Sequence, residues 1–301
     1  ESTRRRVLEA IDTLGYRPSE LARSLRTQRT RTVALLIPDI TNPFYPMLAR
    51  GLQDAIKSGD YHSVVCNTDG DRAEELTFLD QMVARSVDGI VIVGFGTDEK
   101  HLRRVEDAGI PVVAFGPQFT LDAADLVGAD DRVGMAEATR YLIGKGLRPI
   151  GFVGPSSDAG PGRVRRSGYE DALRQAGLPV DPSLVAGEDY TRESGAAAMR
   201  RLLEAPAVPR GVVCVNDLIA IGVLDVARAH GIAVPDDLAV VGFDDIEAAS
   251  LTSPRLTTVV NPAYEEGRTA GQLMLSRLTG DYDGPHRKVI LRCHLVVRES
   301  A

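Results

Sequence analysis

The chain has 301 residues, of which 44% are hydrophobic and 26% charged, as in an ordinary soluble protein with two domains. It has no apolar run near the roughly 18 residues of a membrane-spanning helix, and no secretory leader is visible. The net charge of −7 argues against a surface that binds nucleic acid over its whole extent.

The positive charge is concentrated at one end of the chain. Residues 1–32 contain eight arginines and four acidic residues, a charge of +4, so the remaining residues carry −11. A basic arm on an acidic body is the asymmetry expected when only one end touches the phosphates of nucleic acid. A solvated basic helix explains the same charges equally well.

The first predicted element is a helix over residues 3–14, where four apolar residues recur at helical spacing. A glycine and a proline within residues 15–18 end it. Residues 18–26 are predicted to form a short second helix, which would be marginal by itself in water. Residues 28–31 are predicted to be a linker.

Beyond residue 32, short apolar runs alternate with amphipathic stretches. The apolar runs lie at residues 33–37, 63–66, 89–93, 112–115, 150–153, 211–215 and 238–242. The amphipathic stretches lie at residues 43–58, 72–85, 98–108, 132–145, 165–176, 192–204 and 217–230. Strand-like runs separated by helices predict βαβ units on parallel sheets. Glycines that should end helices stand at positions 109, 146, 177 and 231.

The pattern restarts halfway, because the strand and proline at residues 33–38 have a counterpart at residues 150–155. Seven strands would fit one sheet, but two smaller sheets are favoured, each in a doubly wound lobe whose loops face a shared cleft. The end of the chain, with a helical stretch at 262–279 and a strand-like stretch at 287–298, is predicted to complete both lobes. The predicted domains are residues 1–31, residues 32–145 with 262–280, and residues 146–261 with 281–301.

The sequence contains none of the common catalytic motifs. The sequence lacks a Gly-x-Ser-x-Gly elbow, a His-Glu-x-x-His pair, a Walker loop and a Cys-x-x-Cys pair, and its five histidines have no metal-ligand spacing. Its cysteines, Cys66, Cys214 and Cys293, lie far apart and are predicted to be reduced thiols in a cytoplasmic protein. We therefore expect no cofactor, no metal and no enzymatic activity, and favour a binding protein.

Four polar clusters follow strand-like runs or a flexible loop, at residues 39–45, 163–169, 216–217 and 244–245. A polar ligand can use the free N–H groups of a helix start, or an arginine that clamps hydroxyls or a carboxylate. Helix capping and solvated helix faces are the simpler explanation for Asn42-Pro43, Arg166 and Asp217. Asp244 follows an apolar strand directly and is harder to explain in that way.

The order of these clusters resembles that of the lactose/galactose repressor family over essentially the whole chain. The most specific matches are residues 3–7, 15–18, 39–44, 87–90, 216–222, 240–245 and 254–259. The resemblance implies an α/β fold of two doubly wound Rossmann-like subdomains, like those of type I periplasmic binding proteins. A partial all-α DNA-binding headpiece and a hinge helix would precede them.

In this resemblance, residues 1–14 correspond to the third headpiece helix, without the helix-turn-helix pair that should precede it, and residues 18–26 to the hinge helix. The hinge helices of a family homodimer enter the minor groove and wedge a leucine into a base step, a role that falls to Leu25. A linker leucine that packs on the core is the alternative. The implied contacts with operator DNA are Arg17, Ala22, Arg23, Leu25 and Arg26.

The resemblance also implies an effector site between the lobes. Arg165 matches the family's ligand-clamping arginine and Asp244 its hydroxyl-binding aspartate. The complete implied set is Asn42, Phe44, Tyr45, Asp131, Arg165, Tyr190, Asn216 and Asp244. The expected protein is a repressor that binds a sugar or sugar derivative, acts as a homodimer and does not contact a membrane.

Two other functions fit part of the pattern. A solute-binding protein of a sugar transporter shares the two-lobed core, but it would carry a signal peptide and begin at the first strand, whereas residues 1–32 are basic and helical. A sugar-modifying enzyme would need a convergent acid/base set, which is not found. The regulator is therefore the favoured function.

Overall fold

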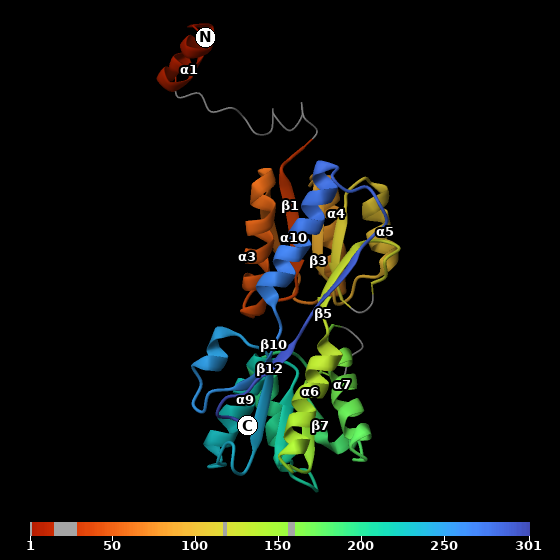
Figure 1. Cartoon of the computed structure of the whole chain (residues 1–301), viewed down its shortest axis with the longest axis vertical. Coiled ribbons are helices and arrows are strands. Elements are labelled where there is room, and N and C mark those ends of the chain that lie inside the picture. Colours follow the sequence, from red (N-terminus) through yellow and green to blue (C-terminus); the bar gives the residue numbers. More distant parts are fainter. Residues whose placement is uncertain (1, 15–28, 117–118, 156–159) are drawn as a thin grey trace.

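A computed structural model describes residues 2–14, 29–116, 119–155 and 160–301, which form an N-terminal helix and two α/β lobes (Figure 1). Helix α1 (Ser2–Leu14) confirms the helix predicted at residues 3–14. The predicted hinge helix lies outside the described residues, and so do the predicted DNA contacts Arg17, Ala22, Arg23, Leu25 and Arg26. No helix of the described part is long and apolar enough to cross a membrane.

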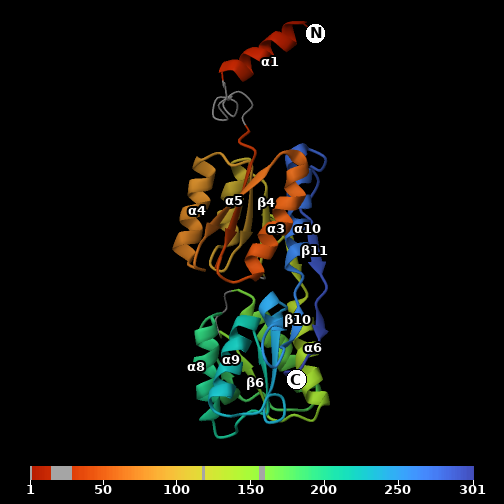
Figure 2. The ribbon, with the colours of Figure 1, turned by 90° about the vertical axis from the view of Figure 1, so that its left-hand side faces the viewer.

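The first lobe is built on a parallel sheet with the strand order β11-β5-β4-β3-β1-β2. Its strands are β1 (Thr32–Ile37), β2 (His62–Asn67), β3 (Gly89–Val93), β4 (Val112–Phe115), β5 (Asp125–Ala129) and β11 (Lys288–Leu291). Helices α3 (Phe44–Ile56) and α10 (Ala263–Thr279) cover one face, and α4 (Arg72–Ala84) and α5 (Glu99–Asp107) cover the other (Figure 2). Successive residues of β1 serve the two faces, since Leu35 packs with α3 and α10 whereas Leu36 packs with α4 and α5.

The second lobe has the strand order β12-β10-β9-β8-β6-β7, with β12 antiparallel to β10 and the other neighbours parallel. Its strands are β6 (Ile150–Val153), β7 (Val185–Ala186), β8 (Gly211–Cys214), β9 (Ala239–Asp244), β10 (Thr257–Val260) and β12 (His294–Val296). Its helices are α6 (Asp131–Gly144), α7 (Gly162–Gln175), α8 (Arg192–Leu203) and α9 (Asp217–Ala229). Short 3-10 helices also occur: η1 (Lys57–Gly59) follows α3 in the first lobe, and η2 (Pro182–Leu184) and η3 (Glu247–Ser250) lie in the second.

The chain passes between the lobes after β5, after β10 and after β11. The first crossing precedes α6, whose Met135 and Leu142 lie in the core of the second lobe, although the predicted boundary at residue 145 placed this helix in the first. The last crossing separates β11 from β12, so residues 281–301 serve both sheets instead of the second alone. An amphipathic pattern shows that an element is buried, but not against which sheet.

The sequence does not predict β5, β7 or β10. β5 begins with the charged Asp125 and contains Gly128, β7 has only two residues, and half of β10 is threonine, so none shows the apolar run that identifies the other strands. The four predicted helix-ending glycines have φ between 68° and 81°, the left-handed region that glycine adopts at low cost: Gly109, Gly146, Gly177 and Gly231.

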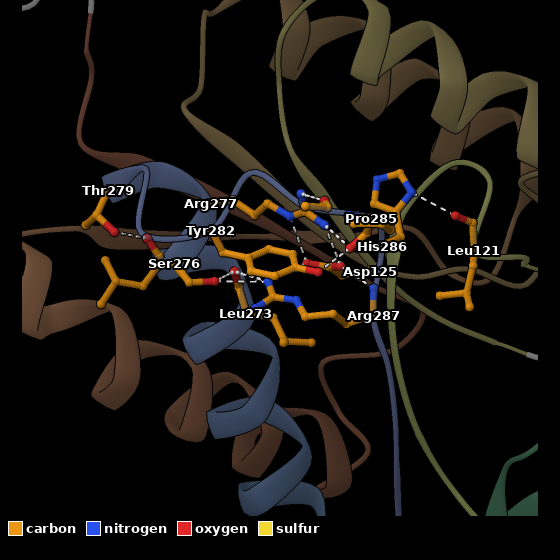
Figure 3. A network of polar contacts seen from close by, with 12 residues as sticks. Leu121, Asp125, Leu273, Ser276, Arg277, Thr279, Tyr282, Pro285, His286 and Arg287 are labelled. Carbon is orange, nitrogen blue, oxygen red and sulfur yellow. Dashed lines mark hydrogen bonds and ion pairs between the residues drawn. The ribbon is translucent and has the colours of Figure 1, made fainter.

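A buried aspartate ties the end of the chain to the first lobe. Asp125, at the start of β5, accepts hydrogen bonds from the side chains of Arg277 and Arg287 and from the backbone of Arg287 (Figure 3). Both guanidinium groups lie over the ring of Tyr282. Burial alone would raise the pKa of Asp125, but the hydrogen bonds from the two arginines lower it. The ionised aspartate thus holds β11 in register beside β5.

Candidate functional site

A cavity of about 720 Å³ lies between the lobes, at the carboxyl ends of strands from both sheets. All eight residues that the sequence predicts for the effector site line it: Asn42, Phe44, Tyr45, Asp131, Arg165, Tyr190, Asn216 and Asp244. The polar clusters that follow separate elements therefore meet at one place in the fold.

Arg165 stands in the polar wall formed by the second lobe, near the start of α7, and is 4% exposed. Its Nε donates to Asp131 Oδ1 at 2.8 Å and its Nη1 to the backbone oxygen of Val215 at 2.6 Å. Asp244 Oδ1 lies 3.2 Å from the same Nη1, and the ring of Phe243 lies beneath the guanidinium group. Burial alone would lower the pKa of Arg165, but Asp131 and Asp244 raise it, so Arg165 is a fixed positive charge.

Asp244 ends β9 in a strained conformation. Its φ is 108° and that of Asp245 is 53°, a region that costs a residue other than glycine about 1–3 kcal/mol. Asn261 Nδ2 donates to Asp244 at 3.2 Å, and Arg298 Nη2 donates to Asp245 at 2.6 Å. Burial raises the pKa of Asp244 to about 6, although Arg165 opposes the shift. Backbone strain and a raised pKa in a cavity wall are typical of a functional position.

Asn216, and not Asp217, caps α9. Its Oδ1 accepts from a backbone N–H of the first turn at 2.8 Å, while its Nδ2 donates to the backbone oxygen of Tyr190 at 2.9 Å. The interpretation of Asp217 as a helix cap is therefore wrong. The carboxyl group of Asp217 is fully buried and accepts hydrogen bonds from the backbone of Ile246 at 2.9 Å and from the hydroxyl of Thr258 at 2.6 Å. Burial raises the pKa of this carboxyl group. Its hydrogen bond with Ile246 joins α9 to the loop after β9.

The first lobe supplies aromatic walls. Phe44 and Tyr45, at the start of α3, lie edge to face with ring centres 5.3 Å apart, and Asn42 Oδ1 accepts from the backbone N–H of Phe44. Phe95, after β3, meets Tyr190 of the second lobe with ring centres 5.5 Å apart. The two lobes therefore touch beside the cavity through an aromatic pair.

Phe95, Asn261 and Glu266 are among the lining residues that the sequence does not single out. Asn261 directly follows β10, a strand that the sequence does not predict, so the reasoning that pointed to Asp244 did not reach it. Glu266 lies in an amphipathic helix, where a single acid gives no sign of burial, yet it is 3% exposed. Burial, together with Asp131, raises the pKa of Glu266 to about 8.

The chemistry of the cavity suits a polyhydroxylated ligand. Carboxyl, amide and guanidinium groups from the second lobe lie opposite the aromatic rings of the first. A sugar ring combines hydroxyl edges with apolar faces, and such walls complement both. The three cysteines are free and buried. Within the described ranges, no group of three or more His, Cys, Asp or Glu side chains could hold a metal ion.

Known proteins match the chain along its whole length. Residues 139–301 match the family model of the periplasmic binding protein-like domain. The chain is 35% identical over 302 residues to the HTH-type transcriptional regulator RegA of Clostridium saccharobutylicum. This match covers 100% of the chain and 90% of RegA.

Two solved structures share the fold. The transcriptional regulator CelR in complex with cellobiose has a TM-score of 0.81 and 32% identity, and the match covers 100% of this chain and 91% of that one. A LacI family transcriptional regulator from Enterococcus faecium with bound ribose has a TM-score of 0.82 and 26% identity, over 89% of this chain and 98% of that one.

These relatives are regulators of transcription, and neither enzymes nor solute-binding proteins of transporters. Their likeness extends over both lobes and, for RegA and CelR, over the basic N-terminal segment as well. The chain therefore belongs to the LacI, or lactose/galactose repressor, family of transcriptional regulators.

Proposed function

We propose that this protein is a repressor whose affinity for operator DNA is set by a sugar or sugar derivative bound in the interlobe cavity. The observation that carries the proposal is the convergence of all eight predicted effector residues on one cavity of about 720 Å³. Similar regulators bind cellobiose and ribose. The proposed location is the cytoplasm, where free cysteines stay reduced.

The proposed coupling uses the angle between the lobes. A ligand between them favours the arrangement that gives it more contacts, and it shifts the equilibrium by its difference in affinity for the two states. The N-terminal segment enters the first lobe at Thr30 and Arg31, whose backbone N–H groups donate to the carboxylate of Asp88 at 3.0 and 2.7 Å. A movement of the first lobe would thus be passed to the segment that leads toward DNA.

A thermal-shift screen against sugars, followed by calorimetry, tests the proposal. A specific ligand at about 100 times its Kd should stabilise the protein by about 2.7 kcal/mol. Arg165→Lys keeps the charge but loses the planar fork, and should weaken binding at least about tenfold. The control is Arg166→Lys, because Arg166 pairs with Glu170 at 2.9 Å and is partly exposed. Unchanged affinity in Arg165→Lys would remove this residue from the site.

We also propose that the protein acts as a homodimer through both lobes. In the first lobe, β2 is an edge strand that packs against α3; β2 exposes Val64 and Val65, and α3 exposes Met47. In the second lobe, Leu251 after η3 is 76% exposed. Covering these apolar side chains would stabilise association.

Sedimentation velocity at micromolar concentration tests the dimer. Met47→Asp combined with Val65→Asp should give a monomer, because charges would then have to be buried in the interface. Val208→Asp, at an exposed valine before β8, should leave the dimer intact. A parent protein that sediments as a monomer with and without ligand would rule the proposal out.

A further inference from the structure

A carboxyl group without a protein partner lies in the cavity wall. Glu266, near the start of α10, is 3% exposed and lines the cavity. Its side chain has no hydrogen bond or ion pair with any described residue. A buried carboxyl group costs free energy unless something completes its hydrogen bonds.

A second acceptor among the residues that line the cavity is also unpaired. The side-chain oxygen Oδ1 of Asn261 is buried and has no hydrogen-bond partner in the described part of the chain. The amide of Asn261 donates to Asp244, which fixes its orientation and leaves Oδ1 without a protein partner. Asn261 and Glu266 lie on the same crossover between the lobes and line the same cavity. A ligand in the cavity would therefore meet Glu266 as an acceptor that no protein group satisfies.

The charges around Glu266 decide which donor fits. The groups that face it are Asp131 at the start of α6, Asp244 at the end of β9 and Arg165 of α7. Arg165 is already engaged by Asp131 and by the backbone oxygen of Val215. Among the described residues of the wall, six carboxyl side chains stand against two basic ones, Arg165 and Lys288. A hydroxyl would supply one donor and no charge, whereas an ammonium group supplies three donors and the missing positive charge.

We propose that the effector carries a protonated amine, as an amino sugar does, and that Glu266 binds its ammonium group. The inference rests on the proposed function, since it assigns a ligand class to the same cavity. Sugar phosphates and uronates are disfavoured by the same carboxyl groups, because like charges in a desolvated site repel each other.

Proton release distinguishes an amine from a neutral sugar. Without ligand, burial together with Asp131 keeps the pKa of Glu266 at about 8, so its carboxyl group holds a proton at neutral pH. An ammonium group beside it favours the ionised form, so the proton leaves Glu266 for the buffer when the amine binds. A neutral sugar leaves that proton in place.

The test is isothermal titration calorimetry with matched pairs of probes: D-glucosamine and D-glucose, D-galactosamine and D-galactose, D-mannosamine and D-mannose. Titrations at pH 6.5 in two buffers of different ionisation enthalpy report the protons released. In at least one pair the amino sugar should bind about tenfold tighter than its neutral partner and release roughly one proton. In Glu266→Gln the preference should fall to within about threefold, and the proton release should disappear.

A neighbouring acid provides the matched control. Glu265 is partly exposed and pairs with Arg268 at 2.6 Å, so Glu265→Gln should change neither the preference nor the proton count. Melting temperatures report whether each variant folds. Glu266→Leu is a second variant, which should keep any binding of the neutral sugar and lose the preference for the amine.

Two outcomes would overturn the inference, and they are distinguishable. If neutral and amino sugars bind equally without proton release, while Arg165→Lys still weakens binding, the amine assignment fails and the sugar effector stands. If no probe of either kind binds, the result contradicts both the amine assignment and the sugar effector.

Discussion

Arg165 of α7 joins Asp131 at the start of α6 to Asp244 at the end of β9. Because all three side chains are largely buried, removal of the guanidinium group would leave carboxylates without compensation. We expect Arg165→Ala to lower the free energy of unfolding by about 3–5 kcal/mol, measured by urea denaturation.

Arg255 provides the control for that measurement. It pairs with Glu299 at 2.8 Å, but both side chains are more than half exposed, so Arg255→Ala should cost under about 1 kcal/mol. Equal losses in the two variants would show that Arg165 contributes no more than a surface pair.

The raised pKa of Glu266 makes the stability of the ligand-free protein depend on pH. Its pKa is about 8 when folded and about 4.3 in an unfolded chain, so the folded protein keeps a proton that the unfolded chain loses. This contribution is complete below about pH 4.3 and is lost as the pH rises toward 8. Asp244, with a pKa of about 6, acts in the same direction.

Melting temperatures measured between about pH 5.5 and 8.5 should therefore fall with rising pH. The fall should be smaller in Glu266→Gln, which cannot titrate, while Asp244 maintains part of it. A slope identical to that of the parent protein would mean that Glu266 is ionised throughout this range.

The sequence predicts those site residues whose place in the fold follows from the ends of the strands. Asn216 follows β8 and Asp244 ends β9, and the carboxyl ends of parallel strands meet at the cleft, so both could be placed there beforehand. Glu266 could not, because charged residues in helices usually face solvent, and only the packing of α10 buries this one. The sequence also could not show whether Asp217 caps a helix or is buried, because its hydrogen-bond partner Thr258 is distant in sequence.

Three pairs of helices pack through glycines. A Cβ on Gly267 of α10 would lie 1.9 Å from the backbone oxygen of Leu48 in α3. Equivalent close approaches occur at Gly168, between α7 and α6, and at Gly222, between α9 and α8. The missing side chains let each pair of helices approach closely.

Gly267→Ala should therefore destabilise the protein by about 1–3 kcal/mol or more, since the methyl group would collide with a backbone atom that cannot give way. Gly144 offers a matched change, because it is also helical but has nothing within 4 Å of the place that an alanine methyl group would take. Gly144→Ala should be neutral or stabilising by up to about 1 kcal/mol. Chemical denaturation of both variants gives the comparison, and equal effects would contradict the close-packing account.

The boundaries of most helices follow from the sequence, as α4 and α9 illustrate, because apolar spacing and caps are local. The assignment of strands to sheets at the end of the chain does not follow from the sequence. One strand-like stretch at residues 287–298 contains β11 and β12, which join different sheets. Local pattern indicates an extended chain, but the partner of each strand is a long-range contact.

The whole molecule is interlocked, because neither lobe is a continuous segment of the chain. β11 forms one edge of the first sheet and β12 one edge of the second. Removal of residues 288–301 should therefore weaken both lobes. Hydrogen exchange should rise in β5 and in β10, their respective neighbours. Faster exchange confined to one lobe would argue against this interlocking.

The same arrangement has a consequence for biosynthesis. While the chain is being made, β5 and β10 are synthesised well before the strands that pair with their outer edges. Both sheets thus present an open edge on the ribosome, the kind of edge that recruits wrong partners. Chaperone protection until residues 288–301 emerge would matter equally for the two lobes, which complete their sheets at almost the same moment.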